Sequence, residues 1–377
     1  MKIAFDLRRI KNPGIGRYMK GLAQAVITHA PEHEYLLVLP PDATDVITAD
    51  RARVQKVSPA MAYYSMREQW QLPRLLRRHH VDVLHSPHFN LPLVCPCPAV
   101  VTIHDVIYLA CEQDLPSRLG RMYYRGMMMA AVRRATRVLT DSEFSRRDII
   151  RYLDADPAKI EVIYPGVDPH FQRITDEERL SAVRDKFRLD EEYILYTGIY
   201  KPRKNHTGLL RAFREFLASG GRARLVIAGP GGEAAAALQR AAAELGIADQ
   251  LVLVGFVPEE DLPALYSAAR VYACPSLYEG FGFTVLEAMA CGVPVVCSAE
   301  TSLPEVAGPA ALYADPRRPQ EFAAAIHLAF SDIQLRLRLI QQGAANCCRF
   351  RWENAARSAV AGYRKAAGAG VEEAVCA

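Results

Sequence analysis

Two glutamates, Glu279 and Glu287, have seven residues between them in a segment that also holds Gly280 and Gly282. The segment follows an apolar, strand-like run and opens a helical pattern. Glycines permit a tight turn and a close backbone approach to a ligand, and the first amide groups of a helix bind anions. We therefore predict a phosphate-binding turn whose two carboxylates contact hydroxyl groups beside the anion. The alternative is an ordinary glycine-containing connection with two solvated glutamates.

The start of the predicted helix is expected to hold the anion itself. Phe283, Thr284 and Val285 are its first residues, so their amide groups have no partner within the helix. Together with the positive end of the helix dipole, these amide groups suit a diphosphate.

A second polar segment, Gly198–Asn205, lies between an apolar run and a helical pattern. Arg203 and Lys204 would then stand at the carboxyl end of a strand, where α/β proteins bind phosphate groups. Arginine offers a planar, bidentate donor and lysine a compact charge, and both suit a diphosphate leaving group. The alternative is an exposed basic loop, but the two glutamates in the same half of the chain favour the phosphate site.

A glycine pair near the N-terminus, Gly14 and Gly16, follows the first apolar run and opens a helical pattern. Met19 stands where the dinucleotide-binding fingerprint has its third glycine, so a nicotinamide site is poorly supported. A flexible loop that closes over a substrate fits better, with a plain turn as the alternative.

Polar side chains also follow other strand-like runs of the N-terminal half. His104 and Asp105 end one run, where His104 could donate a hydrogen bond to a transferred sugar and Asp105 could orient that sugar. His85, Asp141 and Ser142 hold similar positions and are candidates for the acceptor side. A buried histidine held by its neighbours is the alternative at His104.

Short apolar runs alternate with helical patterns along the chain, as in parallel sheets covered by helices. We therefore predict an α/β protein of two Rossmann-like, doubly wound domains that face a cleft, with boundaries at 1–170 and 171–350. The charged stretch 175–192 separates the two series, and a long helix near 319–342 precedes a last helix near 352–367. The runs predict strands near 3–7, 35–39, 81–85, 99–104, 137–140, 160–164, 193–198, 225–229, 251–255, 270–275 and 294–298.

Length and composition fit two globular domains, since the chain has 377 residues, of which 50% are hydrophobic and 23% charged. The formal net charge of +4 is too small to indicate a nucleic-acid partner. No apolar run reaches the ~18 residues of a membrane span. The first residues read as a strand rather than a signal peptide, so we expect a cytoplasmic protein.

Together these segments resemble the family 4 retaining glycosyltransferases of the GT-B fold, and the resemblance covers nearly the whole chain. Its most specific part is the pair of glutamates in E-x7-E with the basic residues upstream. The motifs that carry it are Gly14-Ile15-Gly16, His104-Asp105, the DSEFS stretch that begins at Asp141, the IYPGVD stretch 163–168, Arg203-Lys204-Asn205, and Glu279 with Glu287.

The resemblance implies a role for each matched residue in the donor half. Arg203 and Lys204 would neutralise the diphosphate, and Gly198 would lie beside the donor. Glu287 would bind the ribose hydroxyls, and Glu279 would bind the hydroxyls of the sugar. The main chain from Gly280 through Phe281 and Gly282 to Phe283 and Thr284 would complete the phosphate cradle.

The resemblance also implies the chemistry. His104 would contact the donor sugar in the reaction centre, and Gly14 and Gly16 would approach the diphosphate or the acceptor. Residues 1–170 would form the acceptor domain, on which the helix near 352–367 packs back, and residues 171–350 would form the nucleotide-sugar donor domain. Transfer would retain the anomeric configuration and would need no metal ion or other cofactor.

The finer resemblance is to bacterial mannosyltransferases of surface-polysaccharide synthesis, such as lipopolysaccharide synthesis. It implies GDP-mannose as the nucleotide sugar and a glycan or lipid-linked oligosaccharide as the acceptor. A peripheral contact with the anionic inner membrane would then suit the basic residues Arg118, Arg121, Arg125, Arg133, Arg134 and Arg137. A UDP-hexose-dependent transferase, a sugar-nucleotide epimerase of the same fold and a non-catalytic sugar-binding protein stay open as alternatives.

Overall fold

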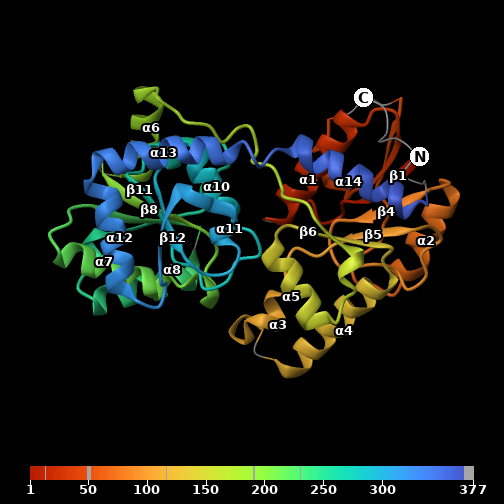
Figure 1. Cartoon of the computed structure of the whole chain (residues 1–377), viewed down its shortest axis with the longest axis horizontal. Helices are drawn as coiled ribbons and strands as arrows, with labels where there is room; N and C mark the ends of the chain where they lie inside the picture. The colour runs from red at the N-terminus through yellow and green to blue at the C-terminus, as the bar shows by residue number, and fades with distance from the viewer. Residues whose placement is uncertain (13, 49–51, 116, 190–191, 230, 369–377) are drawn as a thin grey trace. The chain divides into compact units, whose positions relative to one another are not determined.

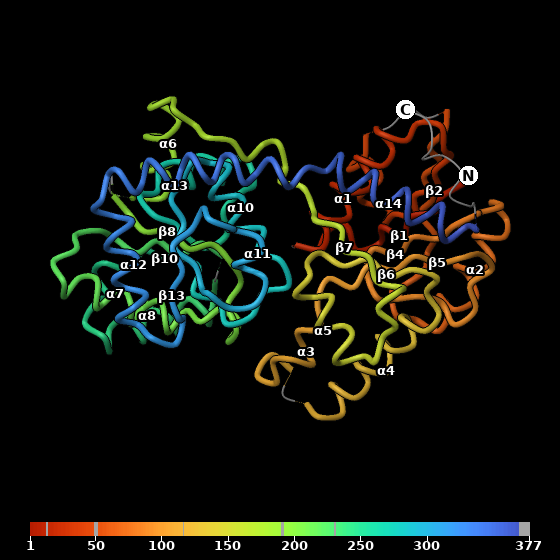
Figure 2. Tube along the Cα trace, in the orientation of Figure 1, coloured from red at the N-terminus to blue at the C-terminus, as the bar shows by residue number. Residues whose placement is uncertain are grey.

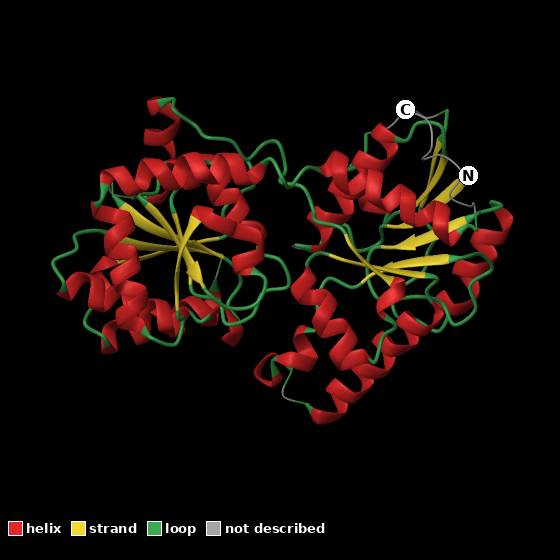
Figure 3. Ribbon diagram, in the orientation of Figure 1, coloured by secondary structure: helices red, strands yellow, loops and turns green. Residues whose placement is uncertain are grey.

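The computed structural model describes residues 1–12, 14–48, 52–115, 117–189, 192–229 and 231–368. The chain divides into two units. Unit 1 gathers Met1–Ala110, Leu115–Gly166 and the chain from Phe350 onward, and unit 2 gathers Cys111–Asp114 and Val167–Arg349. Each unit holds a parallel sheet with helices on its faces (Figures 1 and 3). The predicted pair of Rossmann-like, doubly wound units is therefore confirmed.

Unit 1 contains a seven-stranded sheet in the order β3-β2-β1-β4-β5-β6-β7. Its strands are β1 (Lys2–Asp6), β2 (Glu34–Val38), β3 (Val54–Val57), β4 (Val83–Ser86), β5 (Ala99–Thr102), β6 (Arg137–Thr140) and β7 (Ile160–Val162). Its helices are α1 (Ile15–His29), α2 (Glu68–Arg78), α3 (Ile107–Ala110), α4 (Arg118–Arg134), α5 (Glu143–Leu153) and α14 (Trp352–Ala366), with short 3₁₀ turns η1 (Pro41–Ala43) and η3 (Pro157–Lys159).

Unit 2 contains a six-stranded sheet in the order β10-β9-β8-β11-β12-β13. Its strands are β8 (Tyr193–Thr197), β9 (Arg224–Ala228), β10 (Leu251–Gly255), β11 (Val271–Cys274), β12 (Val295–Ser298) and β13 (Ala311–Ala314). Its helices are α6 (Glu177–Phe187), α7 (His206–Ala218), α8 (Gly232–Glu244), α9 (Leu262–Ser267), α10 (Phe283–Ala290), α11 (Leu303–Ala307), α12 (Pro319–Ser331) and α13 (Ile333–Cys347). Its 3₁₀ turns are η2 (Glu112–Asp114), η4 (Pro202–Lys204), η5 (Ala248–Gln250) and η6 (Gly308–Ala310).

The central strands are apolar along their length because helices cover both faces of each sheet. In unit 2 every residue of β8 is buried, and α7 packs against that sheet through Leu209, Phe213 and Phe216. These positions recur every three or four residues, which is the spacing of one helix face. Burial of such side chains is the main favourable contribution to folding.

Each sheet has one point at which the strand order reverses, and α/β proteins bind ligands at the carboxyl ends of the strands there. In unit 1 that point lies between β1 and β4, and in unit 2 it lies between β8 and β11. The loops after these four strands therefore decide where each unit can hold a ligand.

The last helix, α14, belongs to unit 1 and packs along α1 (Figure 2). A Cβ atom on Gly21 of α1 would come within 2.3 Å of the Trp352 ring, so only glycine fits beneath that indole. Tyr363, near the end of α14, forms a 2.7 Å hydrogen bond between its hydroxyl group and Nδ1 of His85. Helix α14 thus fills part of the core of unit 1, beside α1 and β4.

Several elements differ from the sequence prediction. The charged stretch 175–192 contains α6, with Asp176 as its N-cap residue accepting from the amide of Glu178 at 3.1 Å. The long helix near 319–342 is two helices, α12 and α13, because Asp332 leaves the helical conformation and caps the second one. Among the described residues, no helix combines the length and apolar character of a membrane span.

Candidate functional site

Two loops meet at the switch point of unit 2, and they are the two segments that the sequence singled out. One follows β8 and carries Gly198 and the turn η4, and the other follows β11. The amide of Leu277 donates to the carbonyl of Arg203 at 2.7 Å, which ties the loops together. Asn205 adds a second tie, donating through Nδ2 to the Pro275 carbonyl at 3.2 Å while its Oδ1 caps α7.

Lys204 and Glu279 form the centre of this site. The Lys204 Nζ donates to Oε1 of Glu279 at 2.6 Å, and the hydroxyl of Ser276 donates to the same oxygen at 2.7 Å. The Glu279 amide donates to the Thr301 hydroxyl at 3.2 Å, which fixes the main chain beside it. The carboxylate is buried, so its position is set by these contacts rather than by solvent.

Gly282 joins this loop to α10. Its φ of 112° lies in the left-handed region, and a Cβ atom there would come within 2.7 Å of Leu303. The amides of Phe283 and Thr284 open the helix after it, and the next amide, of Val285, donates back to the Gly282 carbonyl at 3.1 Å. The Val285 amide therefore has a partner within the protein, and the prediction that it binds the anion is wrong. The amides of Phe283 and Thr284 remain as candidates.

The hydroxyl group of Ser302 fixes the main chain before α10. The hydroxyl of Ser302 donates to the carbonyls of Glu279 and Phe281, each at 2.9 Å, so Gly280 lies between two fixed carbonyl groups. The Phe281 ring is buried and packs at a centroid distance of 5.0 Å against that of Phe283. A preformed turn of this kind costs little ordering when a ligand binds.

Glu287 lies one turn into α10 and is also buried. Its Oε2 accepts a 3.0 Å hydrogen bond from the Tyr266 hydroxyl, which lies 2.6 Å from the hydroxyl of Thr197 at the end of β8. The Tyr272 hydroxyl lies 3.3 Å from the same Thr197 oxygen. Burial raises the pKa of Tyr266 and Tyr272 well above the usual tyrosine value, so both remain protonated donors.

Arg203 has a different acidic partner from Lys204. Its guanidinium group forms an ion pair with Asp114, a residue of the short segment Cys111–Asp114 that groups with unit 2. No local sequence pattern indicated this partner, because Asp114 lies far from Arg203 along the chain.

In unit 1, His104 bridges two hydrogen-bond acceptors. Its Nδ1 lies 2.7 Å from Oδ2 of Asp141, and its Nε2 lies 3.1 Å from the Pro87 carbonyl. Both partners accept, so the doubly protonated ring satisfies both contacts. Burial lowers the pKa of His104, but the carboxylates of Asp141 and Asp105 and the Pro87 carbonyl together raise it further, so the net shift is upward. The Tyr18 ring packs edge-on at 4.6 Å.

The other predicted residues of unit 1 make contacts that support the fold. His85 is fully buried, with Nε2 2.9 Å from the Thr102 hydroxyl and Nδ1 bonded to Tyr363. Burial lowers the pKa of His85 to about 3, so the ring is neutral. Asp105 accepts from the amide of Ile107 at 3.0 Å, and the Ser142 hydroxyl caps α5 at 3.0 Å.

The glycine pair near the N-terminus starts α1. Gly14 is the N-cap residue with a φ of 76°, and Gly16 is buried in the first turn. A Cβ atom on Gly16 would lie 2.0 Å from the Ile10 carbonyl oxygen, so the helix can approach this strand connection only through glycine.

Sequence reasoning missed the residues that position the predicted ones. Ser276 and Ser302 hold the Glu279 loop, and Thr197 and Tyr266 hold Glu287. The signal for Thr197 was its place at the carboxyl end of β8. Tyr266 carried no such signal, because it lies within an otherwise apolar helix.

Both halves of the chain match models of known families. Residues 14–171 match the model described as Glycosyltransferase Family 4, and residues 180–346 match Glycosyl transferases group 1.

Curated relatives match over different lengths. The O-antigen chain mannosyltransferase B of Escherichia coli is 33% identical over 97% of this chain and 100% of that protein. The serotype-specific mannosyltransferase WbdA of Escherichia coli is 31% identical over 74% of this chain, but that match spans only 35% of the longer relative.

Solved structures share the fold. Sucrose-phosphate synthase from Thermosynechococcus elongatus has a TM-score of 0.77 at 20% identity, covering 98% of this chain and 100% of that one. HepE from Anabaena, in complex with UDP and glucose, has a TM-score of 0.74 at 19% identity, covering 96% of this chain and 98% of that one. These likenesses support the two-unit GT-B architecture.

Proposed function

This chain belongs to glycosyltransferase family 4, and on that premise we propose that it transfers mannose from GDP-mannose, with retention of anomeric configuration. The proposed acceptor is a glycan or lipid-linked oligosaccharide of O-antigen synthesis. The observation that supports this choice most strongly is the similarity of 97% of the chain to an O-antigen mannosyltransferase.

The proposed chemistry depends on charge at the leaving diphosphate. Negative charge grows on that group as the glycosidic bond breaks, and donors already in place stabilise it without reorganisation. Lys204 and the amides of Phe283 and Thr284 are candidates for these donors, with Arg203 as a second cation. Glu279 and Glu287 would bind the hydroxyls of the sugar and the ribose.

The two glutamates are suited to binding rather than to covalent attack. Glu279 is paired with Lys204, and Glu287 accepts from Tyr266. A carboxylate that acts as a nucleophile needs an oxygen free to attack, and these contacts occupy one oxygen of each glutamate. We propose that His104, held by Asp141 in its charged form, contacts the transferred sugar.

A nucleotide panel tests the donor. Thermal shifts are measured with GDP, UDP, ADP, dTDP and their sugars, and the product anomer is assigned by NMR. We expect GDP and GDP-mannose to raise Tm selectively, Lys204→Ala to abolish the shift, and the product to keep the α configuration. A selective UDP shift would overturn the mannosyl assignment. Epimerised nucleotide sugar formed without acceptor would replace transferase by epimerase, and no shift at all would favour a sugar-binding protein.

We propose that the reaction needs no metal ion. Asp168, His170 and Glu259 have ligand atoms within 4.8 Å of one another, so they form a group that could hold a cation. A D-x-D sequence, a pattern that can bind a metal ion, also occurs at residues 154–156. The Asp156 carboxylate there is used as the N-cap of η3, where it accepts from the Ala158 amide. Activity should survive EDTA. Loss of activity on chelation, with recovery on adding Mn²⁺, would contradict the proposal.

We also propose that α4 rests on an anionic membrane. Leu119, Met122 and Tyr123 are 78%, 64% and 67% exposed, and these positions follow one helix face. Exposed arginines 118, 133 and 134 lie on the same helix. Apolar side chains beside basic ones suit an interface with anionic lipid.

Vesicle co-sedimentation tests this surface. Phosphatidylglycerol vesicles should retain the protein more than phosphatidylcholine vesicles, and Arg118→Glu with Arg133→Glu and Arg134→Glu should release it. Arg211→Glu with Arg214→Glu on α7 of unit 2 is the control for Arg133→Glu with Arg134→Glu, since each of these variants reverses two exposed arginines. Equal retention of the α4 variant would reject the surface.

A further inference from the structure

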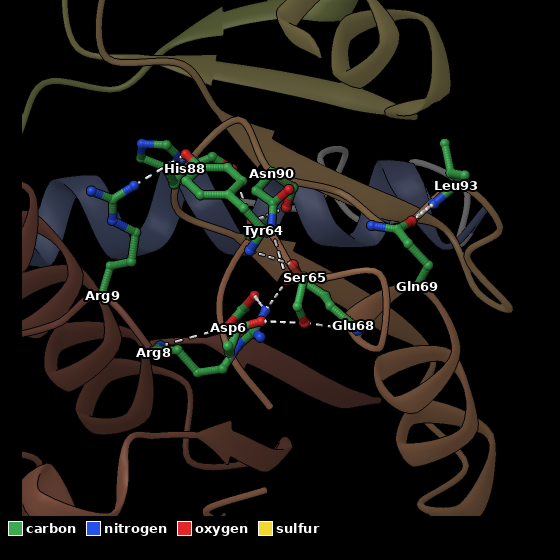
Figure 4. Close-up of polar contacts among 12 residues, drawn as sticks. Asp6, Arg8, Arg9, Tyr64, Ser65, Glu68, Gln69, His88, Asn90 and Leu93 are labelled. Atoms are coloured by element: carbon green, nitrogen blue, oxygen red, sulfur yellow. Dashed lines mark hydrogen bonds and ion pairs between the residues drawn. The ribbon is translucent and has the colours of Figure 1, made fainter. Parts of the chain in front are cut away.

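We propose that a group of side chains in unit 1, called the Tyr64 cluster, binds a neutral sugar residue of the acceptor. Its members are Asp6, Arg8, Arg9, Tyr63, Tyr64, Glu68, His88 and Asn90. The members that Figure 4 labels lie close together, and dashed lines mark polar contacts among them. The inference rests on the proposed function in one respect, that the sugar is the acceptor's.

The Tyr64 cluster lies at the switch point of its sheet. Asp6 ends β1, and His88 and Asn90 follow β4, the neighbour of β1 across the reversal of strand order. This is the place where an α/β unit binds ligands. The site in unit 2 holds the corresponding position between β8 and β11. The candidates His104 and Asp141 follow β5 and β6, so the Tyr64 cluster is a separate set of groups.

A buried ionic frame holds the Tyr64 cluster. Arg8 donates through Nε to Oδ1 of Asp6 at 2.7 Å and through Nη2 to Oδ2 at 2.6 Å. The same Nη2 forms an ion pair with Glu68, whose Oε1 also accepts from Asn90 Nδ2 at 2.7 Å. A buried ion pair adds little to stability compared with apolar packing. Its use here is to hold Arg8 and Asn90 in fixed positions.

Three polar atoms of this frame lack a partner among the described residues. They are Nη1 of Arg8, Oδ1 of Asn90 and the hydroxyl of Tyr63, and all three are buried. Buried polar groups without a partner are rare and call for an explanation. Nη1 of Arg8 can donate a hydrogen bond, Oδ1 of Asn90 can accept one, and the Tyr63 hydroxyl can donate or accept. Sugar hydroxyl groups both donate and accept, so they can satisfy all three atoms.

The charge of the frame favours a neutral ligand. Arg8 is already shared by two carboxylates, so the buried ions carry an excess of negative charge before Arg9 is counted. A phosphate or a carboxylate placed at Arg8 would meet Asp6 and Glu68 as well. A neutral hydroxyl-bearing ring meets no such repulsion.

Aromatic rings supply the other half of a sugar site. The Arg8 guanidinium lies 4.8 Å from the Tyr63 ring centroid, and the Tyr63 and Tyr64 rings are 4.8 Å apart. Tyr64 also stacks at 6.1 Å on Phe89, and its hydroxyl accepts from Arg9 at 3.1 Å. Such rings can cover the apolar face of a pyranose while their hydroxyl groups remain available for hydrogen bonds.

Tyr64 combines an exposed ring with an uncommon backbone conformation. It is 45% exposed, and its φ of 62° is uncommon for a bulky side chain. Its amide donates to Oε2 of Glu68 at 2.8 Å, which ties the loop to the ionic frame. Because the three unpartnered atoms are buried, a sugar reaches them when this loop shifts.

Saturation-transfer NMR on the full chain, without nucleotide, tests the proposal. The probes are methyl α-mannoside, methyl α-glucoside and mannose 6-phosphate. Tyr63→Phe is the sharpest variant, because it deletes a hydroxyl that has no partner in the described structure and so should leave Tm unchanged or higher. Binding of a neutral glycoside should weaken about fivefold in Tyr63→Phe and about tenfold in Tyr64→Ala.

Tyr313→Ala in unit 2 is the matched control, and it should leave the probes bound as in the parent protein. Three results would overturn the proposal: no saturation of either neutral glycoside, unchanged binding in both Tyr63→Phe and Tyr64→Ala, or stronger binding of mannose 6-phosphate. Because no nucleotide is present, a failure of the GDP-mannose assignment would leave this outcome unaffected.

Discussion

The ammonium group of Lys204 lies 2.6 Å from Oε1 of Glu279, so the cation proposed for the diphosphate is paired with the carboxylate proposed for the sugar. Ser276 donates to the same oxygen, so the Glu279 carboxylate keeps one hydrogen bond when Lys204 turns to a diphosphate. A diphosphate near Lys204 would therefore compete with Glu279 for one set of N–H donors.

Replacing the cation should remove most of the catalysis. We expect Lys204→Ala to lower kcat/KM for the nucleotide sugar about 100-fold, since one lost donor to a developing oxyanion has that effect. Lys201→Ala, in the same loop, should change it less than threefold, which is about 0.6 kcal/mol. Steady-state kinetics of both variants test this prediction. An equal decrease of kcat/KM in both variants would mean that a disturbed loop, and not the lost charge of Lys204, causes the decrease.

Replacing the carboxylate should separate nucleotide binding from transfer. Glu279→Gln keeps the shape but frees Lys204 from its ion pair, so the Kd of GDP should stay the same or decrease. Transfer should fall at least about tenfold, because a hydroxyl bond to a charged acceptor is lost. Calorimetry with GDP, beside initial rates, checks both. A parallel loss of GDP affinity would contradict the separation.

Tyr266→Phe tests the support of Glu287. The variant removes the hydrogen bond to Glu287, worth about 1 kcal/mol, together with the contact to the Thr197 hydroxyl, and we expect GDP to bind about fivefold more weakly. Tyr193→Phe loses a comparable buried bond, from its hydroxyl to the Leu265 carbonyl at 2.6 Å, without touching Glu287. It should cost similar stability and leave GDP affinity intact. Nucleotide titrations that show the same loss in both would point to general loosening.

Gly282→Ala should damage the phosphate turn. An alanine at a φ of 112° costs about 1–2 kcal/mol, and its Cβ atom would also collide with Leu303 at 2.7 Å. Gly246→Ala has a positive φ of 72° with no atom within 4 Å, so it should carry the backbone cost alone. We expect both to lower Tm and only Gly282→Ala to abolish the GDP shift.

The buried neutral ring of His85 predicts acid sensitivity in unit 1. Its folded pKa of about 3 lies below the usual value of 6.5, so its contribution is present above pH 6.5 and is lost as the pH falls toward 3. Between pH 6.5 and 5 the loss is about 2 kcal/mol. Trp70 and Trp352, the two tryptophans of the sequence, both lie in unit 1, so their fluorescence in urea reports its unfolding. His85→Gln should flatten the pH dependence, and an unchanged slope would exclude His85 as its source.

The fold was predictable where strands are buried on both faces. Runs such as Tyr193–Thr197 are buried throughout and almost entirely hydrophobic, which makes a strand easy to recognise. The strand Val54–Val57 was missed because it lies at the sheet edge, where its inner residues Gln55 and Lys56 are exposed. The helix Glu177–Phe187 buries only Val183, so its charged face hid the helical pattern.

Part of the candidate site was predictable from short segments of sequence. The sequence analysis placed Lys204 and Glu279 in one site, and the structure brings them together, whereas Arg203 pairs with Asp114. The Tyr64 cluster was not predictable, because Arg8 and Glu68 come from distant segments that meet only after the sheet forms. Pairing of that kind leaves no local pattern in the sequence.

The packing of α14 on α1 has a consequence for the order in which the protein is made. The ribosome completes all of unit 2 before it reaches Trp352 and Tyr363, the residues that fill the core beside Gly21 and His85. Domains usually fold as units during synthesis, from the N-terminus onward. Unit 1 therefore begins before unit 2 but receives α14 after it, so Gly21 and His85 lack their contacts with Trp352 and Tyr363 until α14 has been synthesised.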